Sequence, residues 1–370
     1  MKKLLYFSHG LSANGIETFL VNVLGKLNLE KYDTTVLIAI DEGVECLHEK
    51  TVRDLGIRIV YAGDLDSVKK KLAYVRNVMR ELKTGNYDIV HSNMDLLNGI
   101  TLTLAKIAGV KKRICHGHTT KSQYKAQGSL AKIKSFVQKI YFRIMKALIV
   151  SASTDLLSCS ELAGEYFYGL RESTVIYNGI NLERFSCEVD RNTYLSKFGI
   201  PQADKRLVSV GRISPVKNPF FALEVMTELR KIRSDFQYIW VGDGELSDEI
   251  KKKVCELGLE VTVFFTGVQT DIPEILNCCD CFFMPSLFEG LPFSLIEAQA
   301  AGLKCVVSDA VSRTADVGLI EYVSLKKTAG EWAEIISEKL DLPSMTADSE
   351  KIKKFDINYT VKQLEEIYDR

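Results

Sequence analysis

Short apolar runs with the character of β-strands alternate with longer amphipathic segments along the whole chain. This alternation is typical of parallel sheets whose two faces are covered by helices. In the first half the expected strands span residues 3–7, 34–40, 58–61, 89–91, 113–116, 147–150 and 173–177. In the second half they span residues 206–210, 238–241, 261–266, 281–284, 304–307 and 321–323. Because 370 residues exceed what one hydrophobic core usually supports, the pattern predicts an α/β fold with two doubly wound domains.

The break between the domains is expected at residues 178–185, after the last strand of the first sheet. We therefore expect an N-terminal domain over residues 1–183 and a C-terminal domain over residues 184–354. The chain ends in an expected helix at about residues 358–368, where apolar side chains recur at helical spacing.

Two carboxylates, Glu289 and Glu297, stand eight positions apart across an expected junction between a loop and a helix. Pro292 can occupy the first turn of this helix, which places Glu289 in the loop and Glu297 about one turn inside the helix. The backbone N–H groups of Phe293 and Ser294 are then free to donate to a phosphate, which the helix dipole also favours. Carboxylates on either side can accept hydrogen bonds from sugar and ribose hydroxyls. This arrangement suits a charged sugar nucleotide.

The loop after the first expected strand covers residues 8–17 and opens a helix near Gly15. A helix start after a strand is a natural site for a diphosphate, although a plain structural turn is the alternative. Asn14 tolerates a positive φ better than most residues, so it can serve in a tight turn there. The fingerprint G-x-G-x-x-G is absent, which counts against nicotinamide or flavin chemistry.

Charge divides the chain into opposite halves. Residues 1–183 hold 25 Lys and Arg against 18 Asp and Glu, and the second half has the reverse excess. No acidic residue occurs between Asp95 and Asp155, whereas eleven basic residues lie between Lys106 and Lys146. Such a block differs from an ordinary solvated face, which mixes charges of both signs.

The later part of this basic segment, residues 106–146, is also amphipathic. Its apolar residues at helical spacing are Ile133, Phe136, Val137, Ile140, Tyr141, Ile144 and Leu148, and its basic residues are Lys132, Lys134, Lys139, Arg143 and Lys146. One hypothesis is a core helix with a basic outer side. The other is docking to anionic lipid head groups at a membrane surface. Nucleic-acid binding ranks last, because the aromatic residues are not interleaved for stacking on bases and the other half of the chain is acidic.

Cysteine usage and hydropathy bear on location. The chain has nine cysteines and begins without the pattern of a secretory leader, so we expect reduced thiols and a cytoplasmic protein. No apolar stretch is long enough to span a bilayer, which leaves peripheral association with the inner face of the cell membrane. Cys278, Cys279 and Cys281 invite a metal site, but structural packing is favoured because they lack the paired spacing of zinc ligands.

All five histidines lie in the first third of the chain, at positions 9, 48, 91, 116 and 118. His9, His91 and the pair His116 and His118 follow or end expected strands. Ligands bind outside the carboxyl ends of strands in doubly wound folds, so these histidines are candidate site residues, although any one of them is more often structural.

Four ordered elements carry a resemblance to a known family. They are the E-x7-E segment from Glu289 to Glu297, the run VSVGR at 208–212 followed by Lys217, the turn VGDG at 241–244, and VIYNGI at 175–180. Together they resemble the retaining GT-B glycosyltransferases of the E-x7-E superfamily (glycosyltransferase family 4, glycosyl transferases group 1). The likeness spans most of the chain and is greatest to bacterial enzymes of exopolysaccharide or capsule biosynthesis.

The resemblance implies a GT-B fold with two Rossmann-like domains facing a central cleft. The N-terminal domain would bind the acceptor, with the C-terminal helix (about 355–370) packing back on it, and the C-terminal domain would bind the nucleotide sugar. The implied catalytic residues are Glu289, His118 (with His116 as the alternative), Arg212 and Lys217. The implied donor-binding residues are Gly15, Arg212, Lys217, Val268, Glu289, Gly290, Leu291, Phe293, Ser294 and Glu297.

Within this set, Arg212 and Lys217 can neutralise a diphosphate leaving group as its charge develops, a service that a metal would otherwise perform. We therefore expect no metal and no cofactor besides the donor. The D-x-D pair Asp64 and Asp66 lies in an expected surface loop, far in sequence from the other motifs.

The expected activity is transfer of a sugar, with retention, from a nucleotide-diphosphate sugar such as a UDP-sugar to a lipid-linked saccharide. The expected partners are this donor, this acceptor and an anionic membrane surface contacted through residues 106–146, with no nucleic acid. Two alternatives stay open. A sugar-nucleotide epimerase of the same fold would need no separate acceptor, and a non-catalytic partner subunit would bind another glycosyltransferase.

Overall fold

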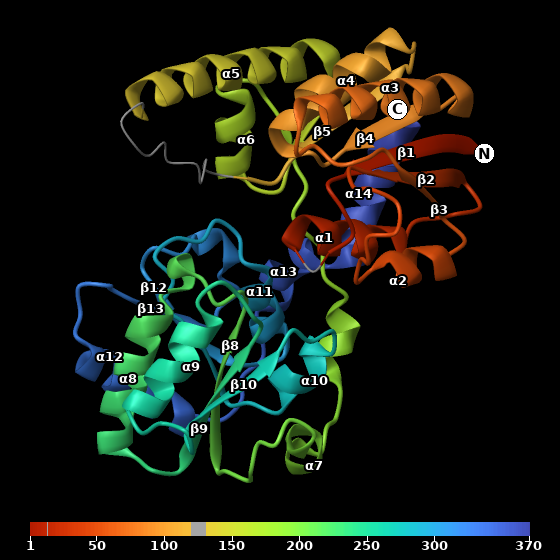
Figure 1. Ribbon diagram of the computed structural model, residues 1–370. Helices are drawn as coiled ribbons and strands as arrows, with labels where there is room; N and C mark the ends of the chain where they lie inside the picture. Colours follow the sequence, from red (N-terminus) through yellow and green to blue (C-terminus); the bar gives the residue numbers. More distant parts are fainter. Residues whose placement is uncertain (13, 120–130) are drawn as a thin grey trace. The chain divides into compact units, whose positions relative to one another are not determined.

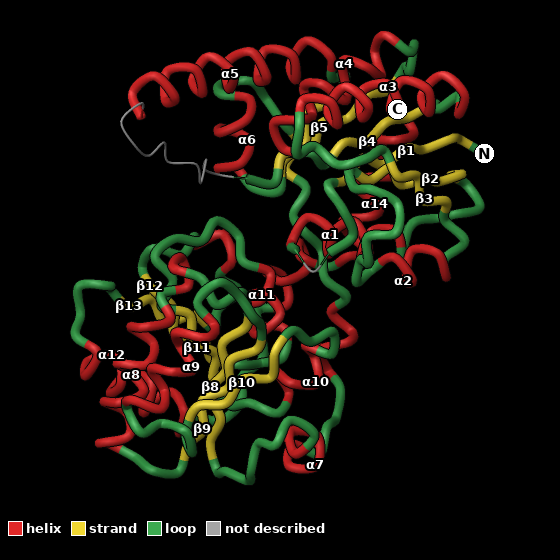
Figure 2. Tube along the Cα trace, viewed as in Figure 1, coloured by secondary structure: helices red, strands yellow, loops and turns green. Residues whose placement is uncertain are grey.

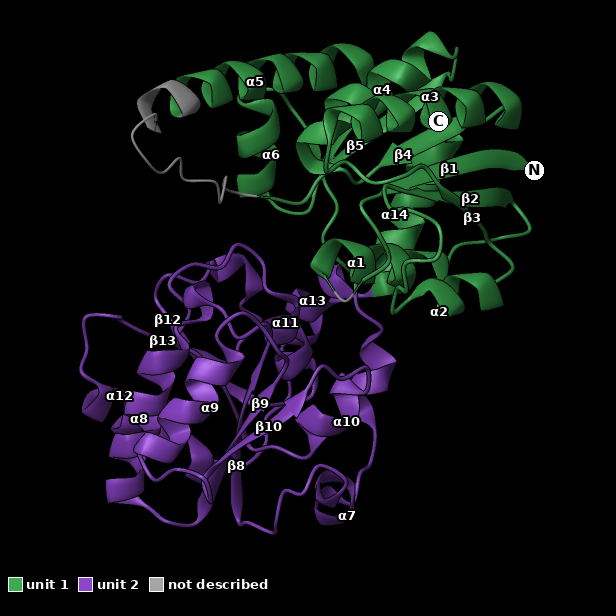
Figure 3. Cartoon of the chain, in the orientation of Figure 1, with its two compact units in different colours: residues 1–179, 357–370 green, residues 180–356 purple. Residues whose placement is uncertain are grey.

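The computed structural model describes residues 1–12, 14–119 and 131–370, and the side chains of residues 131–134 also lie outside the described part. The chain forms two compact units (Figure 3). Unit 1 comprises Met1–Gly179 and Ile357–Arg370, and unit 2 comprises Ile180–Asp356. The change of unit therefore comes slightly earlier than residue 183, within the segment that connects the last strand of the first sheet to the next domain.

Unit 1 is built on a seven-stranded sheet in the order β3-β2-β1-β4-β5-β6-β7 (Figure 1). Every pair of neighbouring strands is parallel. Its strands are β1 (Lys2–Ser8), β2 (Tyr32–Ile38), β3 (Arg58–Tyr61), β4 (Ile89–Ser92), β5 (Lys112–Gly117), β6 (Asp155–Ser158) and β7 (Thr174–Val175). In β1 the consecutive residues from Leu4 to Phe7 are all buried, because helices cover both faces of the sheet.

The helices of unit 1 divide between these two faces, and the strands lie between them (Figure 2). They are α1 (Gly15–Leu24), α2 (Glu49–Asp54), α3 (Val68–Gly85), α4 (Asn98–Ile107), α5 (Ala131–Ala152), α6 (Glu161–Tyr168) and α14 (Ile357–Asp369). Leu5 and Phe7 of β1 share a core with residues of α3, α4, α5 and α6. The opposite face is covered by α1 and α14. No helix in the part of the chain that the structure describes is long and apolar enough to cross a membrane.

The strand expected at residues 147–150 is wrong, because this segment is the end of helix α5. The strand that occupies the corresponding place in the sheet is β6, which begins at Asp155. Met145, Ile149 and Ala152 are buried at helical spacing, so the apolar run belongs to a helix that continues past Ile144. This face packs on α4 at Gly99, where a Cβ atom would come within 2.8 Å of the carbonyl oxygen of Met145.

Unit 2 has a six-stranded parallel sheet in the order β10-β9-β8-β11-β12-β13. Its strands are β8 (Lys205–Val210), β9 (Phe236–Val241), β10 (Val263–Gly267), β11 (Cys281–Met284), β12 (Lys304–Ser308) and β13 (Ile320–Val323). Its helices are α7 (Arg191–Ser196), α8 (Pro219–Ile232), α9 (Ser247–Glu256), α10 (Ile272–Asn277), α11 (Phe293–Ala300), α12 (Ala329–Asp341) and α13 (Ser349–Ile352). Both sheets therefore have the doubly wound arrangement that the alternating pattern predicts.

The core of unit 2 lies between the sheet and helices α8, α9 and α12. Trp332 of α12 is completely buried there and packs edge to face against Phe283 of β11 and Phe221 of α8. Cys281 belongs to the same core, and its neighbours Cys278 and Cys279 are also buried. Burial raises the pKa of the Cys281 thiol to about 12, as expected for cysteines that serve packing.

Helix α14 is the last helix of the chain and belongs to unit 1. Its Tyr368 hydroxyl lies 2.6 Å from Nδ1 of His91 and hydrogen-bonds with the hydroxyl of Tyr6. The other ring nitrogen of His91 is 3.2 Å from Nδ1 of His116. His91 therefore anchors this helix through Tyr368. Both His91 and His116 are completely buried and are not open to a ligand, contrary to the expectation for histidines at strand ends. Burial also lowers the pKa of His91 to about 3 and keeps the imidazole neutral.

We expect Tyr368→Phe to lower the free energy of unfolding by about 1–3 kcal/mol, because it leaves buried polar groups of His91 and Tyr6 without a partner. Chemical denaturation followed by circular dichroism measures the change. Tyr359→Phe on the exposed side of the same helix is the matched control and should change stability little. Equal effects of the two substitutions would contradict an anchoring role for Tyr368.

Candidate functional site

The sheet of unit 2 reverses its strand order between β8 and β11. These two strands are neighbours, but the chain continues from β8 to β9 and β10 on one side and from β11 to β12 and β13 on the other. The loops that follow β8 and β11 therefore diverge at the carboxyl edge, which is where doubly wound sheets bind ligands. Arg212 and Lys217 follow β8, and Glu289 follows β11.

An ion pair joins these two loops. Nζ of Lys217 lies 2.7 Å from Oε1 of Glu289, and each side chain is 18% exposed. The backbone N–H of Leu287 donates to the carbonyl of Val216 at 2.8 Å, so the main chain holds the loops together as well. The structure thus brings together two residues that stand 72 positions apart in the printed sequence.

Three glycines let the loops after β8 and β9 pack closely. A Cβ atom on Gly242 would lie 2.3 Å from the carbonyl oxygen of Gly211, and one on Gly244 would lie 2.4 Å from that of Ile213. Gly211 and Gly242 also have φ values of 142° and 135°, which other residues rarely adopt. These contacts explain why both turns need glycine, and they leave Arg212 exposed to solvent at the same edge.

Helix α11 begins beside Glu289. Pro292 is its N-cap, in extended conformation, so Phe293 is the first helical residue and the expectation of Pro292 inside the first turn is wrong by one position. No side chain caps this end, which leaves the N–H groups of Phe293 and Ser294 at the positive end of the helix dipole. The loop before it is fixed by the Ser312 N–H, which donates to the Glu289 carbonyl at 3.1 Å. Gly290 and Leu291, in this loop, are half-buried.

Glu297 lies one turn inside α11 and is half-buried. Burial raises the pKa of its carboxyl group to about 7, and the positive charge of Arg184 opposes the rise. Arg184 belongs to a short 3-10 helix (Leu182–Ser186) that contacts α11. Arg184 is not predicted as a site residue from the sequence, because it lies near Glu297 only through the tertiary fold and no motif or spacing indicates this.

Val268 follows β10 at the same carboxyl edge. It comes directly after Gly267, whose φ is 70° and whose carbonyl accepts a hydrogen bond from the N–H of Gly242 at 2.9 Å. Val268 itself is exposed, so its backbone lies beside the glycine turn after β9. Arg212, Lys217, Val268, Glu289, Gly290, Leu291, Phe293, Ser294 and Glu297 therefore all belong to loops or helix turns on one edge of unit 2.

Gly15 and His118, the other predicted site residues, belong to unit 1. Gly15 is the first residue of α1, and Asn14 before it has a φ of −93°, so the turn does not use the positive φ that we considered for Asn14. His118 follows β5, and its Nε2 lies 2.8 Å from Oδ1 of Asn93. Burial lowers the pKa of His118 to about 3, so its imidazole is neutral and can donate or accept a hydrogen bond.

The D-x-D pair is engaged in its own loop. The carboxylate of Asp64 pairs with Lys70 and also accepts from the N–H of Asp66 at 3.1 Å. Within the described part of the chain, no group of three or more His, Cys, Asp or Glu side chains could hold a metal ion.

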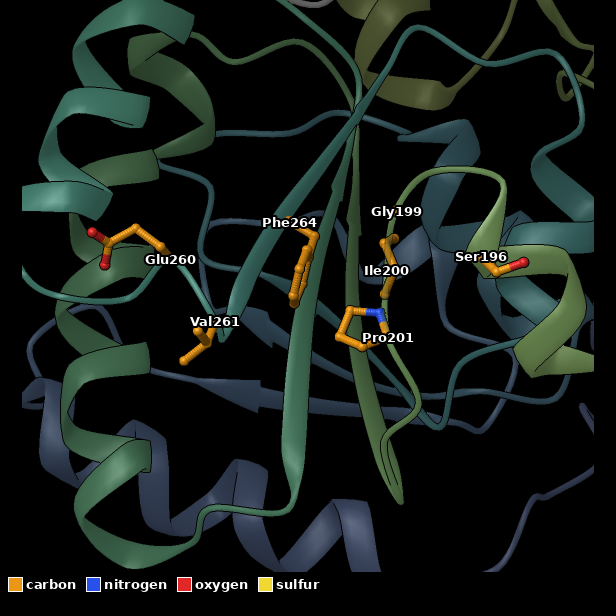
Figure 4. A pocket seen from close by; sticks show the side chains of 7 residues that line it. All are labelled: Ser196, Gly199, Ile200, Pro201, Glu260, Val261 and Phe264. Carbon is orange, nitrogen blue, oxygen red and sulfur yellow. The ribbon is translucent and has the colours of Figure 1, made fainter.

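A separate hollow of about 450 Å³ lies in unit 2 (Figure 4). Its lining includes Ile200 and Pro201, which precede β8, and Glu260 and Val261, which precede β10. These residues stand at the amino ends of the strands, whereas the Lys217–Glu289 pair stands at the carboxyl ends. The hollow is therefore not part of the candidate site.

Two family models match this chain. The model of Glycosyltransferase Family 4 matches residues 13–184, and that of Glycosyl transferases group 1 matches residues 190–343. Among similar proteins, Bacillus subtilis (strain 168) EpsF, whose name describes it as a glycosyltransferase, is 31% identical over 345 residues, covering 91% of this chain and 87% of EpsF. The Escherichia coli UDP-Gal:alpha-D-GlcNAc-diphosphoundecaprenol alpha-1,3-galactosyltransferase is 26% identical over 313 residues, covering 82% and 80% of the two chains.

Solved structures match the fold over nearly the full chain. HepE from Anabaena, in complex with UDP and glucose, aligns with a TM-score of 0.77 and 18% identity over 100% of both chains. WaaG, a glycosyltransferase involved in lipopolysaccharide biosynthesis, aligns with a TM-score of 0.70 and 15% identity over 99% of both chains. Since both parts of the chain match glycosyltransferase models and EpsF is 31% identical along most of its length, the chain belongs to the glycosyltransferases of family 4 and group 1, with the GT-B fold.

Proposed function

We propose that this glycosyltransferase moves a sugar, with retention, from a UDP-sugar to a lipid-linked saccharide in the synthesis of an exopolysaccharide or capsule. The observation that carries the proposal is the Lys217–Glu289 ion pair at the point where the strand order of unit 2 reverses. The pair offers a cation for a pyrophosphate and a carboxylate for sugar hydroxyls, and these two groups lie 2.7 Å apart.

The pyrophosphate would be held by cations and backbone amides. Arg212 offers a planar set of N–H donors, Lys217 offers a compact charge, and the uncapped start of α11 offers the N–H groups of Phe293 and Ser294. These groups stabilise negative charge as it develops on the departing diphosphate. Because these groups can neutralise the diphosphate themselves, they support the proposal that catalysis needs no metal.

The two carboxylates would bind the two sugars of the donor. Glu289, in the loop before α11, accepts from hydroxyls of the transferred sugar, and Glu297, inside the helix, accepts from ribose hydroxyls. The exposed backbone of Val268 would contact the base. Gly15 and His118 stay predicted donor contacts from unit 1.

Retention is proposed from the family resemblance. The bond between the anomeric carbon and the diphosphate oxygen breaks through an oxocarbenium-like transition state that the departing diphosphate stabilises. The acceptor hydroxyl oxygen forms the new bond on the same face of this carbon, and its proton passes to the diphosphate. No protein nucleophile is required by this route. The contribution of the chain is to position both substrates and to stabilise the leaving group.

The names of two relatives support a lipid-linked acceptor. The Escherichia coli relative acts on alpha-D-GlcNAc-diphosphoundecaprenol. The Campylobacter jejuni relative, 24% identical over 99% of this chain, is an N,N'-diacetylbacillosaminyl-diphospho-undecaprenol alpha-1,3-N-acetylgalactosaminyltransferase. Staphylococcus aureus CapH, 26% identical over 86% of this chain, is a capsular polysaccharide biosynthesis glycosyltransferase. Lipid-linked saccharides of this kind lie in a membrane.

Helix α5 supports docking to such a membrane. Most of its described apolar side chains before Met145 are exposed, for example Phe136 at 63% and Ile144 at 50%, with Val137, Ile140 and Tyr141 also exposed, while Phe142 is half-buried. The hypothesis of a core helix therefore holds only for the end that contains Met145, Ile149 and Ala152. The exposed apolar residues alternate with the exposed cations Lys139 and Arg143, as in helices that lie on anionic lipid. Lys132 and Lys134, whose charges contribute to the sequence prediction, lie outside the described side chains.

The function is tested by incubating the protein with a panel of UDP-sugars and GDP-sugars, with and without alpha-D-GlcNAc-diphosphoundecaprenol in vesicles. We expect release of UDP that depends on the acceptor, together with a glycosylated lipid detected by mass spectrometry. Glu289→Ala and Arg212→Ala should each lower turnover about a hundredfold or more, because removal of one preorganised stabilising group costs about 3 kcal/mol. Glu260→Ala, at the amino end of β10, is the matched control and should keep wild-type turnover.

The same panel separates the alternatives. Conversion of the donor sugar into an isomer without acceptor would identify an epimerase. Absence of turnover with every donor and acceptor, in a protein that still binds a second glycosyltransferase, would identify a partner subunit. Either result would overturn the proposal.

Affinity for a UDP-sugar should rise as pH increases through about 7, where the Glu297 carboxyl group loses its proton and becomes able to accept from both ribose hydroxyls. Glu297→Gln should bind more weakly at high pH and should lose this pH dependence. Calorimetric titrations between about pH 5.5 and 8.5 measure both effects. A UDP-sugar is a better ligand than UDP for this titration, because its pyrophosphate is substituted at both ends and does not titrate in this range.

The unliganded protein provides an independent check of the Glu297 pKa. Folding raises the pKa of this carboxyl group to about 7. Such a group contributes stability at pH values below its pKa in the unfolded chain, and this contribution is lost as pH rises through its pKa in the folded protein. Glu297→Gln should therefore be more stable than wild type by about 1–3 kcal/mol at pH 8.5 and not at low pH. Wild type and variant with the same pH dependence of stability would show that Glu297 titrates normally.

Membrane docking predicts that Lys139→Glu with Arg143→Glu lowers binding to phosphatidylglycerol vesicles at least about tenfold, because each basic residue near an anionic surface contributes about 1 kcal/mol. Sedimentation with vesicles measures the bound fraction. Lys69→Glu with Arg76→Glu on α3 makes the same change in net charge at exposed positions and is the matched control. Vesicle binding that falls equally in both double variants, or in neither, would rule out docking through α5.

A further inference from the structure

Three histidine rings lie in a row inside unit 1, and the row leads from helix α14 to His118. The rings of His91 and His116 are stacked, with centroids 5.3 Å apart and an interplanar angle of 20°. The centroids of His116 and His118 are 4.2 Å apart. At the other end of the row, His91 contacts Tyr368 of α14. The row therefore joins the last helix of the chain to the residues that follow β5.

Hydrogen bonds fix the first part of this row. The Tyr368 hydroxyl is 2.6 Å from Nδ1 of His91, and Nε2 of His91 is 3.2 Å from Nδ1 of His116. Burial lowers the pKa of His91 to about 3 and that of His116 well below its usual value, so both rings are neutral and each carries one N–H. The bond between the rings needs one donor and one acceptor. The tautomer of His91 therefore determines that of His116.

Packing and one further hydrogen bond hold His118 at the end of the row. Its Nε2 donates to Oδ1 of Asn93 at 2.8 Å, and the backbone N–H of Asn93 donates to the Phe7 carbonyl of β1 at 3.0 Å. Phe19 of α1 is completely buried, and the centroid of its ring is 5.1 Å from those of both His116 and His118. The His118 ring is thus held by His116, Phe19 and Asn93.

The three rings differ in their access to a ligand. His91 and His116 are completely buried, whereas His118 is half-buried. A substrate at the carboxyl edge of unit 1 can therefore reach His118 but not the two rings behind it. Since protein interiors are closely packed, a displacement of His116 would be transmitted to the ring that rests against it.

We propose that Tyr368, His91 and His116 are positioning residues that set the orientation of His118 toward the substrates. The inference rests on the proposed function, in which His118 contacts the donor from unit 1. A misplacement of about 1 Å caused by a distant substitution can lower a reaction rate about a hundredfold. Helix α14 would thus contribute to turnover through the row of rings, although its Tyr368 is completely buried.

The test compares Tyr368→Phe with Tyr32→Phe. Both substitutions remove a hydroxyl that anchors α14, because the Tyr32 hydroxyl donates to Oδ1 of Asp369 at 3.1 Å, but of the two tyrosines only Tyr368 bonds to His91. With the donor and acceptor that the panel identifies, Tyr368→Phe should lower kcat about tenfold or more, and Tyr32→Phe should keep wild-type kcat. The dissociation constant for UDP should match wild type in both, because the groups proposed to hold the pyrophosphate, ribose and base belong to unit 2.

A second variant separates positioning from anchoring. In His91→Asn, the amide can occupy the place of Nδ1 beside Tyr368 but is too short to reach His116, which the native ring contacts through Nε2. This variant should therefore keep α14 anchored and still lower kcat about tenfold or more. Wild-type kcat in folded His91→Asn would overturn the inference.

NMR of protein with nitrogen-15-labelled histidine decides the same question without turnover, because ring nitrogen signals report the tautomer and surroundings of His118. These signals should shift in Tyr368→Phe and stay in place in Tyr32→Phe. Unchanged His118 signals in Tyr368→Phe, or an equal loss of kcat in both variants, would overturn the inference in favour of a structural role. Failure of transfer by wild type with the whole panel would instead count against the proposed function, and the NMR comparison would still decide whether the row positions His118.

Discussion

The Lys217–Glu289 ion pair is the interaction on which the carboxyl edge of unit 2 depends. Its members are mostly buried, and removing either one would leave a charge with little solvent to stabilise it. The pair therefore holds the loops after β8 and β11 in one geometry before any substrate arrives. In the proposed function, a pyrophosphate beside Lys217 would add negative charge next to this cation while the two loops kept their positions. Such preorganisation is what makes electrostatic stabilisation effective in catalysis.

Close packing of two glycine turns shapes the carboxyl edge of the sheet in unit 2. Gly211 and Gly242 approach so closely that no side chain fits between them, and the indole N–H of Trp240 donates to the Gly211 carbonyl at 2.9 Å. Trp240 of β9 therefore helps to fix the start of the loop after β8. Arg212, the next residue, is exposed at a point that the backbone defines rather than at the end of a mobile loop. A cation on a fixed backbone loses less freedom when it binds a phosphate.

Much of this arrangement is predictable from local sequence, and its exceptions have physical reasons. Buried parallel strands are short apolar runs, so twelve of the thirteen expected strands coincide with or overlap strands of the structure. The exception at residues 147–150 fails because an apolar run of four residues has the same composition in a buried helix end as in a buried strand. The spacing of Glu289 and Glu297 predicts the loop and helix around them, since both residues belong to one local element. The role of His91 is not predictable in this way, because its partner Tyr368 comes from the other end of the chain.

Electrostatics at the two carboxyl edges also shows why net charge is a poor guide to a ligand. The second half of the sequence is acidic overall, yet its edge presents Arg212, Lys217 and the positive end of α11, which together suit an anion. The first half is basic overall, yet the residues that follow β4 and β5 at the carboxyl edge of unit 1 include Asp95 and His118, whose imidazole is neutral. Charges separated from a ligand by more than about 10 Å are largely screened by salt, so the groups within contact distance decide what binds. The basic excess of the first half is concentrated between Asp95 and Asp155, and within this segment exposed cations of α5 lie beside exposed apolar side chains. The net charge of a half therefore says little about its ligand, and the groups at each carboxyl edge decide what can bind there.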